Sequence, residues 1–499
     1  MTDMLHPSSR LIIVSNRLPF EIEEKEGRSI PRPGSGGLIT ALAPILRNRG
    51  GIWCGWPGGL EGGSEETSSL IQQAEEQSGY TFSPVFLNNE EVDNYYYGFS
   101  TEIIWPLFHD LQTLSNFRPE YWDAYKRVNE KFAENIVQNA SERDFIWVHD
   151  YHLMLVGEAL RQKKVQSKTA FFLHIPFPSI DIFMKLPWRF EVLRALLSYD
   201  LIGLQTMQDY RNFIQCLRLL RKEVQTTSMK GMHLCRAKQR ETRVGAFPIS
   251  IDFQEFSSHA TSLEVEEAAW FLHEKWKEEK LLFSVDRLDY TKGIVVRLEA
   301  IRLFLLRYPE YRKKVRFIQL LVPSRTKIKE YSDLKQEVDR LVSEINSQFA
   351  EDNWMPIQYV YRPMSRLELL SHYRTSDVAL VTSIKDGMNL VSKEYVACQV
   401  EKKGVLILSQ FAGSAHQLQH GALLVNPYHI EEVSDAIYRA LEMGFEEKKK
   451  RIQSMQRVIK KHDVFWWMQS FLEAAFAKRL TDFPRILGDW HQFDFLHSS

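Results

Sequence analysis

Short, continuously apolar runs recur along this chain and alternate with longer amphipathic stretches, and this alternation restricts the possible folds more than any other feature. Apolar runs without polar alternation are typical of strands buried on both faces, as in a parallel sheet covered by helices. The predicted strands are Leu11–Ser15, Phe145–His149, Ala170–His174, Leu201–Gln205, Arg243–Phe247, Leu281–Val285, Val315–Leu321, Ile357–Tyr361, Val378–Val381 and Val405–Leu408. Helical periodicity fills the intervals, most clearly at Tyr121–Asn139, Ile294–Arg307 and Tyr331–Phe349. The repetition of strand and helix therefore predicts a doubly wound α/β fold.

The length of the chain and one break in this alternation predict two domains. At 499 residues the chain exceeds the size at which a single hydrophobic core keeps growing. The pattern runs over residues 11–247 and restarts at Leu281, and the charged interval Asp252–Lys280 is expected to be a linker with a helix at Leu263–Lys277. We therefore expect two Rossmann-like domains with a cleft between them, followed by a last helical stretch at Val464–Arg479.

The composition argues against several classes of protein. Lys and Arg number 63 and Asp and Glu number 64, so the net charge of −1 argues against a general polyanion binder, while a local basic pocket is still allowed. The four cysteines lie far apart and form no CxxC pair, so neither a disulfide scaffold nor a zinc site is expected. The polar start of the chain and the lack of a long apolar run predict a cytoplasmic protein without a signal peptide or a membrane span.

The stretch HIPFPSIDIF, which begins at His174, places an ionisable ring at the end of a predicted strand. Pro176 and Pro178 follow at once, and they end the strand because proline removes an amide donor and restricts the backbone. In open α/β sheets, ligands bind outside the carboxyl ends of strands, so His174 is a candidate for contact with a ligand. The alternative, which a lone histidine favours, is a core residue whose ring is satisfied by a backbone carbonyl.

Two further motifs occupy similar positions in the first half. SNRLPF ends a strand near Arg17, and PGSGGLITAL places Gly36 and Gly37 before a helical pattern, where backbone amides can approach an anion. The pattern is neither GxGxxG nor a P-loop, so a nucleotide fingerprint is absent and a plain loop entering a helix is the alternative. In WVHDYHL, Asp150 can accept hydrogen bonds from substrate hydroxyls; a helix N-cap or, with His152, a metal ligand are the alternatives.

The second half carries two motifs with charged residues after predicted strands. In SVDRLDYTKG, Arg287 and Lys292 suit a diphosphate, and solvated surface charge is the alternative. In VTSIKDGMNLVSKEYVACQ, Asp386 forms a turn and Met388–Val391 opens a helix whose free amides can bind a phosphate. Glu394 lies about two turns into that helix and can bind vicinal hydroxyls, as acidic residues bind a ribose, unless it merely faces solvent.

Taken in order, WPLFHD, WVHDYHL, FFLHIPFPS, RLDYTKG, VPSR, DGMNLVSKEYVACQ and ILSQFAGSA resemble the motifs of the trehalose-6-phosphate synthase family of retaining glycosyltransferases. The resemblance covers nearly the whole chain and implies a GT-B fold, in which two Rossmann-like domains face each other across a cleft. Residues 1–252 would then bind the acceptor and residues 253–461 the donor, with a C-terminal helix within residues 462–499 packing back on the first domain. The implied reaction moves glucose from UDP-glucose, or another nucleotide sugar, to glucose 6-phosphate, without a metal or other cofactor.

The resemblance also implies residue roles. The donor would be bound by Gly36, Gly37, Arg287, Lys292, Asp386, Met388, Asn389, Leu390 and Glu394. The acceptor would be bound by Arg17, Tyr96, Trp105, Asp150 and Arg325. His174 and Asp150 would lie at the reaction centre, with the His174 ring on the transferred glucose, while Arg287 and Lys292 act in catalysis by stabilising the diphosphate leaving group. No second carboxylate is obviously placed as a nucleophile, and the resemblance implies that the leaving phosphate accepts the proton of the acceptor.

Some features leave alternatives open. Transfer to glycerol 3-phosphate and a non-catalytic sugar-phosphate regulator are the other functions considered. The variable segment Ser64–Ser78 and the basic segment Thr226–Glu241, expected to be a loop, could alter acceptor choice or assembly, including a homo-oligomer. The DxDxT motif of a phosphatase is absent from the sequence, so a separate phosphatase is expected to act on the product. Neither a nucleic acid nor a membrane is an expected partner.

Overall fold

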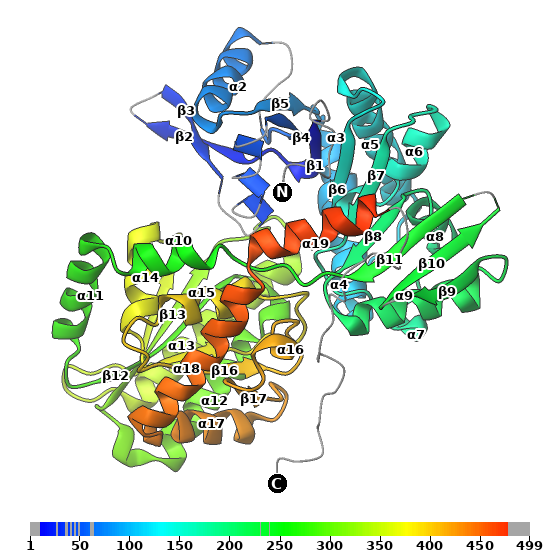
Figure 1. Cartoon of the computed structure of the whole chain (residues 1–499). Helices are drawn as coiled ribbons and strands as arrows, with labels where there is room; N and C mark the ends of the chain where they lie inside the picture. The colour runs from blue at the N-terminus through cyan, green and yellow to red at the C-terminus, as the bar shows by residue number, and fades with distance from the viewer. Residues whose placement is uncertain are drawn as a thin grey trace. The chain divides into compact units, whose positions relative to one another are not determined.

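The computed structural model describes residues 10–25, 28–34, 38–39, 42–43, 46–47, 50–59, 64–229, 231–238 and 240–477. These residues form two compact units (Figure 1). Among the described residues, unit 1 comprises those as far as Ile249 together with residues 465–477, and unit 2 comprises Ser250–Val464. No helix in the described ranges is both long enough and apolar enough to cross a bilayer.

Unit 1 is built on a nine-stranded sheet in the order β5-β4-β1-β6-β7-β8-β11-β10-β9. The strands are β1 (Leu11–Arg17), β4 (Gly51–Trp56), β5 (Thr81–Pro84), β6 (Phe145–His149), β7 (Lys168–Phe172), β8 (Leu201–Leu204), β9 (Gln225–Met229), β10 (Met232–Ala237) and β11 (Arg240–Ala246). Pairs from β5 to β11 in this order are parallel. Each strand predicted for this half is present, and a separate hairpin pairs β2 (Phe20–Lys25) with β3 (Arg28–Pro33).

The expectation of a basic loop at Thr226–Glu241 is wrong. This segment forms β9, β10 and the start of β11, which pair antiparallel at one edge of the sheet. The strands were not predicted because an edge strand can carry polar side chains on its exposed face, and the residues of β9 are all exposed or only partly buried.

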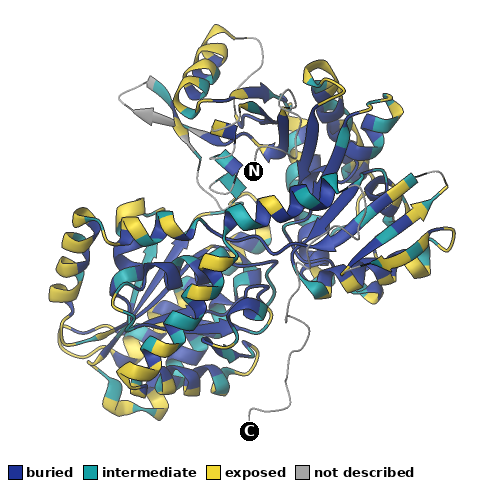
Figure 2. Cartoon of the chain, in the orientation of Figure 1, coloured by how far each residue is buried: buried dark blue, intermediate teal, exposed yellow. Residues whose placement is uncertain are grey.

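Helices cover this sheet, and its parallel strands are buried (Figure 2). They are α2 (Glu65–Ser78), α3 (Asn89–Glu91), the π-helix η1 (Val92–Ile104), α4 (Trp105–Phe108), η2 (Gln112–Leu114), α5 (Pro119–Asn139), η3 (Tyr151–Leu153), α6 (Val156–Gln162), α7 (Ile180–Phe183), α8 (Arg189–Leu196) and α9 (Met207–Leu220). The prediction of a long helix ending at Asn139 is confirmed by α5. The variable segment at 64–78 is the helix α2, which Ser64 caps by accepting a hydrogen bond from the Thr67 amide.

The last helix, α19 (Val464–Phe476), packs on the sheet of unit 1. Phe471 stacks on Trp147 of β6 with ring centroids 4.4 Å apart, and Trp467 lies 5.1 Å from the same ring. Gly203 allows this approach, because a Cβ there would lie 2.6 Å from both Phe172 and Phe471. The Arg243 guanidinium donates to the carbonyls of Ala474 and Ala477, each at 2.7 Å, and so binds the end of the helix.

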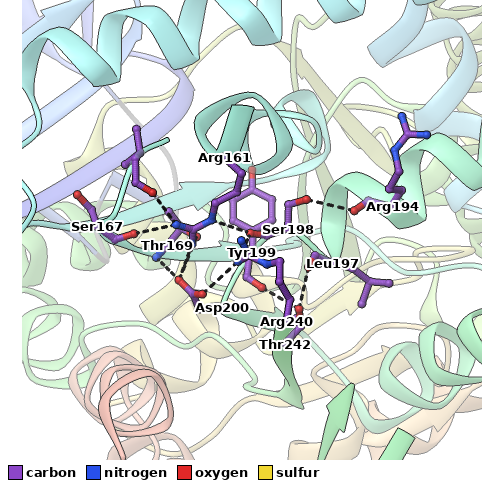
Figure 3. Close-up of polar contacts among 11 residues, drawn as sticks. Arg161, Ser167, Thr169, Arg194, Leu197, Ser198, Tyr199, Asp200, Arg240 and Thr242 are labelled. Carbon is purple, nitrogen blue, oxygen red and sulfur yellow. Dashed lines mark hydrogen bonds and ion pairs between the residues drawn. The ribbon is translucent and has the colours of Figure 1, made fainter. Parts of the chain in front are cut away.

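Asp200 joins the amino ends of three neighbouring strands (Figure 3). Its Oδ2 accepts from the Thr169 amide of β7 and from Arg161 of α6, both at 2.8 Å. Its Oδ1 accepts from Arg240, the first residue of β11, at 3.3 Å. Because the network lies at the amino ends of the strands, it stabilises the sheet at the edge opposite the one where a ligand is expected.

Unit 2 contains a six-stranded sheet in the order β14-β13-β12-β15-β16-β17, and all of its pairs are parallel. The strands are β12 (Lys280–Arg287), β13 (Val315–Val322), β14 (Ile357–Tyr361), β15 (Val378–Val381), β16 (Val405–Ser409) and β17 (Leu423–Val425). The helices are α10 (Phe253–Ala260), α11 (Leu263–Lys275), η4 (Tyr290–Lys292), α12 (Ile294–Arg307), η5 (Pro309–Tyr311), α13 (Lys329–Phe349), α14 (Arg366–Thr375), α15 (Leu390–Cys398), α16 (Ala415–Leu418), α17 (Ile430–Glu442) and α18 (Phe445–Lys461).

Within Asp252–Lys280 the helix expected at Leu263–Lys277 is confirmed by α11, but the expectation that the rest of this segment is a linker is wrong. The segment forms α10 and α11, and their apolar residues Phe253, Phe256 and Val265 are part of a buried cluster with Phe283 of β12. The apolar residues are spaced so that they lie on one side of the two helices, but the high charge of the segment concealed this pattern in the sequence.

Candidate active site

The predicted site residues follow the carboxyl ends of the parallel strands in both units. In unit 1 these are Arg17, the last residue of β1, Asp150 after β6 and His174 after β7. In unit 2 they are Arg287, the last residue of β12, Lys292 after it, Arg325 after β13, and Asp386, Met388 and Asn389 after β15. Gly36 and Gly37 lie outside the described residues. Each sheet therefore gathers its candidate residues at the edge where α/β proteins bind ligands.

Asp150 links the ends of β6 and β7. Its φ is 75°, an unusual value for a residue other than glycine, and its amide donates to the Phe172 carbonyl at 2.7 Å. Its Oδ1 accepts from the His174 amide at 3.2 Å, and this side-chain bond ends the β7 ladder at Phe172 rather than at the predicted His174. Within the described chain the Asp150 side chain makes no capping hydrogen bond to η3, so the N-cap alternative is wrong.

The His174 ring is held between two side chains. Its Nε2 lies 3.1 Å from His149 Nδ1, and its Nδ1 lies 3.4 Å from Gln205 Nε2. Gln205 Oε1 accepts from the Ile249 amide at 3.0 Å, which directs the amide nitrogen of Gln205 at the ring. His174 Nδ1 is therefore the acceptor, and Nε2 carries the proton toward His149. The ring is partly exposed and has side-chain partners, so it does not match the core alternative of a backbone-satisfied histidine.

The electrostatic environment keeps this pair of rings neutral. Burial lowers the pKa of His174 to about 3. Burial, together with the neighbouring His174, lowers the pKa of His149 well below its usual value. Neither ring is a proton donor of the imidazolium type at neutral pH, so His174 can act through position and neutral hydrogen bonding.

Arg17 and Tyr96 meet through a tryptophan that the sequence did not point to. The Arg17 guanidinium lies 4.1 Å from the ring centroid of Trp56, at the end of β4, and Tyr96 lies 5.9 Å from the same ring. Gly58 makes room, because a Cβ there would lie 2.6 Å from Arg17 Nη1. Among the described residues Arg17 has no carboxylate partner, so its charge is available to an anion. Trp56 was overlooked because β4 was not predicted.

Tyr96 and Trp105 belong to one chain of aromatic rings. Tyr96 stacks on His152 at 6.0 Å, His152 lies 3.9 Å from Tyr151, and Tyr151 lies 5.8 Å from Trp105. Tyr96 lies on η1, a π-helix of 13 residues, and Trp105 follows it. Because π-helical turns are rare and occur often at functional sites, η1 supports a binding role for this region.

In unit 2, three cations surround one buried carboxylate. Burial raises the pKa of Asp289, but Arg325, Arg287 and Lys292 outweigh burial and hold that pKa below its usual value. The Arg325 side chain is buried and lies 3.7 Å from Asp289, and it also donates to the Tyr331 hydroxyl at 2.5 Å. The structure thus places Arg325 beside Arg287 in unit 2, whereas the other acceptor candidates lie in unit 1.

Lys292 also makes a close ion pair with Asp386, at 2.6 Å. Both side chains are mostly buried, so the alternative of solvated surface charge is wrong for Lys292. Asp386 accepts further hydrogen bonds from Ser383 at 3.2 Å and Asn389 at 3.1 Å. The pair connects the loop after β12 with the loop after β15.

The loop before α15 is held rigidly. Asn389, with φ 69°, caps the helix by accepting from the Ser392 amide at 3.0 Å. Ser414 donates its amide to the Met388 carbonyl at 2.8 Å, and a Cβ on Gly413 would lie 2.0 Å from the Gly387 carbonyl oxygen. The helix is present but begins at Leu390, two residues after the predicted start at Met388, and the first amides of α15 can bind an anion.

Glu394 is partly buried on the second turn of α15. It accepts a hydrogen bond from the Tyr373 hydroxyl at 2.9 Å, and burial raises its pKa. The alternative of a solvent-facing residue is therefore wrong. Tyr373 comes from α14, and no sequence motif pointed to it. No group of three or more His, Cys, Asp and Glu side chains that could hold a metal occurs in the part of the chain that the structure describes.

Two Rossmann-like units built on parallel-dominated sheets are the architecture of the GT-B class of sugar-transferring enzymes, and the predicted GT-B fold is confirmed. The chain belongs to glycosyltransferase family 20, whose family model matches residues 9–476.

Relatives and solved structures agree with this assignment. The chain is 40% identical to the trehalose-6-phosphate synthase of Mycolicibacterium vanbaalenii over 476 residues, which is 94% of this chain and 96% of that protein. It is similar to the crystal structure of a UDP-forming α,α-trehalose-phosphate synthase from Burkholderia xenovorans in complex with glucose 6-phosphate, with a TM-score of 0.84, 35% identity and coverage of 94% and 100%. It is also similar to an E. coli structure bound with UDP-2-fluoroglucose, with a TM-score of 0.83, 35% identity and coverage of 94% and 99%.

Proposed function

We propose that this protein is a retaining glycosyltransferase that moves glucose from UDP-glucose to glucose 6-phosphate and releases α,α-trehalose 6-phosphate and UDP. The observation that carries the proposal is the cluster of Arg287, Lys292 and Arg325 around Asp289, with Lys292 paired to Asp386 in the loop before α15, in a chain similar over 94% of its length to UDP-forming synthases. Such a cluster suits a diphosphate that gains negative charge as it leaves.

The residues of unit 2 provide for the donor. Arg287 offers a forked donor and Lys292 a point charge to the diphosphate, joined by the first amides of α15. Asp386, oriented by Lys292, would accept hydrogen bonds from glucose hydroxyls, and Glu394, oriented by Tyr373, would accept them from the ribose. These cations supply the charge stabilisation that a metal supplies in other transferases, so the reaction is proposed to need no metal.

The residues of unit 1 provide for the acceptor and the reaction centre. Arg17 would bind the acceptor phosphate, and the aromatic rings of Tyr96 and Trp105 would line the sugar. Asp150 would accept acceptor hydroxyls, while the neutral His174 would orient the transferred glucose. Gly36 and Gly37 are proposed to lie against the donor on the strength of their motif alone.

The proposed domain roles follow from this division. Residues 1–252, with the C-terminal helix, are proposed to carry most of the acceptor groups and residues 253–461 the donor groups, and Arg325 of unit 2 is proposed to bind the acceptor phosphate. Retention is proposed to proceed with the leaving phosphate accepting the proton of the acceptor hydroxyl. The product keeps its phosphate, so a separate phosphatase in the cytoplasm is the proposed next step.

A panel of donors and acceptors tests the proposal. UDP-glucose, GDP-glucose and ADP-glucose are each combined with glucose 6-phosphate or glycerol 3-phosphate, and release of the nucleoside diphosphate is followed in a coupled assay. We expect the highest kcat/KM for UDP-glucose with glucose 6-phosphate. A higher value for glycerol 3-phosphate would assign the other acceptor, and binding of both sugars without release would assign a regulator.

A further inference from the structure

Unit 2 contains a groove that none of the proposed substrates uses. It has a volume of about 680 Å³ and lies where α10, the end of α15 and α18 contact one another. Its lining residues are Phe253, Ser257, Thr261, Ala397, Gln399, Val400, Lys402, Gln453, Gln456, Arg457 and Lys460. The volume falls within the range of about 300–1,000 Å³ that small-molecule sites occupy.

The charged residues that line this groove are all positive. Three of its lining residues, Lys402, Arg457 and Lys460, are cationic, and no carboxylate is among them. In the described part of the chain none of the three forms an ion pair, whereas nearby arginines such as Arg374 and Arg451 are paired with glutamates. Cations that line one groove without counter-charges favour an anionic ligand.

A second cavity provides a contrast. It has a volume of about 400 Å³ and lies in unit 1 between α5, α6 and α8. Its Arg194 is paired with Glu158 at 2.7 Å, and Lys126 is paired with Asp123 at 2.9 Å. Its charges are therefore already compensated within the protein, and the cavity has no comparable preference for an anion.

The remaining lining residues indicate the kind of anion. The hydroxyls of Ser257 and Thr261 and the amide of Gln453 are groups that hydrogen-bond sugar hydroxyls, while Phe253 and Val400 provide an apolar wall. We propose that this groove binds a small phosphorylated sugar as a regulatory ligand, with the phosphate on the three cations.

A hydrogen-bonded path joins the groove to the donor residues. Gln399, which lines the groove, donates to the Tyr373 carbonyl at 2.5 Å, and the Tyr373 hydroxyl donates to Glu394 at 2.9 Å. Gln456 of α18, also in the lining, donates to the carbonyls of Val396 and Gln399 and so holds the end of α15. The ligand contacts one end of α15 while Leu390 and Glu394 lie toward the other end, so its binding alters the affinity for the nucleotide. This coupling rests on the proposed donor site, whereas binding in the groove does not.

Calorimetry on the full chain tests the binding. Inorganic phosphate, ribose 5-phosphate and fructose 1,6-bisphosphate are titrated in the presence of saturating UDP, which occupies the proposed donor site and is not a sugar phosphate of the class proposed for the groove. We expect the sugar phosphates to bind more tightly than inorganic phosphate. Equal weak binding of all three would indicate an adventitious anion only and would overturn the proposal.

A matched pair of double variants locates the binding. Lys402→Ala/Lys460→Ala removes two groove cations, and Lys277→Ala/Lys450→Ala removes two exposed lysines of unit 2 outside the groove. We expect the first variant to bind fructose 1,6-bisphosphate at least tenfold more weakly and the second to bind it as the parent does. Equal affinity in the two variants, or a changed molar mass of the first in light scattering, would overturn the proposal.

The coupling has its own readout. Saturating fructose 1,6-bisphosphate should change the Kd for UDP at least threefold, and Tyr373→Phe, which removes only the hydroxyl on Glu394, should abolish that change while the groove still binds its ligand. An unchanged Kd in the parent chain would refute the coupling. If UDP did not bind at all, the proposed function would fail, but the titration of the groove would remain interpretable.

Discussion

Replacing Lys292 with methionine separates its ion pair with Asp386 from its proposed role in stabilising the leaving group. The substitution keeps most of the volume of the side chain but removes the ammonium, which lies 2.6 Å from Asp386 Oδ2. The two side chains are only 13% and 14% exposed, so the pair is largely buried. Removing one partner of a buried pair costs about 3–5 kcal/mol. Because Asp386 keeps Ser383 and Asn389 as donors, we expect the lower end, about 3 kcal/mol of unfolding free energy.

A double variant, Lys292→Met/Asp386→Asn, removes both charges of this ion pair. Replacing both partners of an interaction is close to neutral, so the unfolding free energy should return to within about 1 kcal/mol of the parent. Activity should not return, because the leaving group still lacks a cation; losing one such group costs about 2.7–4 kcal/mol, or a factor of about 10²–10³ in kcat. Stability and activity should therefore respond differently to the second substitution.

Urea unfolding and initial rates of UDP release measure the two quantities, with Lys277→Met as the control because that lysine is exposed in the same unit. The unfolding is analysed for the transition of unit 2, since a chain of two units need not unfold in one step. If the double variant regained more than about a tenth of the parent rate, the role of Lys292 would be to neutralise Asp386, and the leaving-group argument would be refuted.

Three further outcomes are expected. His174→Ala should lower kcat at least a hundredfold with a Tm close to that of the parent. Near-normal turnover would mean that the His174 ring serves packing and not catalysis. Burial holds the pKa of His174 at about 3 and that of His149 well below its usual value, whereas histidines of an unfolded chain titrate near about 6.5. The unfolded chain then binds more protons, so the free energy of unfolding should fall as pH drops from about 6.5 toward 3. Urea unfolding at stepped pH measures this fall, and His149→Gln should make it shallower. Equal slopes of unfolding free energy against pH in the parent and the variant would contradict the lowered pKa of His149. Arg17→Ala should raise the KM for glucose 6-phosphate at least tenfold without lowering Tm. Arg325→Ala should raise that KM and also lower Tm, because Asp289 loses a buried neighbour. Initial rates and thermal melts compare the two variants, and an unchanged Tm for Arg325→Ala would count against the buried pair.

The sequence predicted elements well where one apolar pattern ran without interruption. The bounds of β6, Phe145–His149, and of α12, Ile294–Arg307, match the prediction because their cores are continuously apolar or regularly periodic. The end of β7 was misplaced because the amide of His174 bonds to the side chain of Asp150, and a tertiary bond of this kind leaves no trace in local hydrophobicity. The edge strand β9 was missed for another reason: its residues are all exposed or only partly buried, so it has no apolar run to detect.

The candidate site was predictable in its charged residues but not in their partners. Arg287, Lys292 and Asp386 follow predicted strands, so their position at one sheet edge could be inferred from topology. Tyr373 and Gln205 orient Glu394 and His174 from elements far away in the sequence. Neither residue carries a motif, and their contribution depends on packing that only the folded chain shows.

The placement of α19 has a consequence for how the protein is made. Trp467 and Phe471 cover Trp147 in the sheet of unit 1, and Arg243 binds the end of the same helix. During synthesis the strands of unit 1 leave the ribosome first, but the helix that covers them leaves after the whole of unit 2. Unit 2, whose described residues are continuous in sequence from Ser250 to Val464, can complete its core earlier. The unit translated first is thus the unit whose core is completed last, and until then its sheet exposes tryptophan and phenylalanine side chains to chaperones.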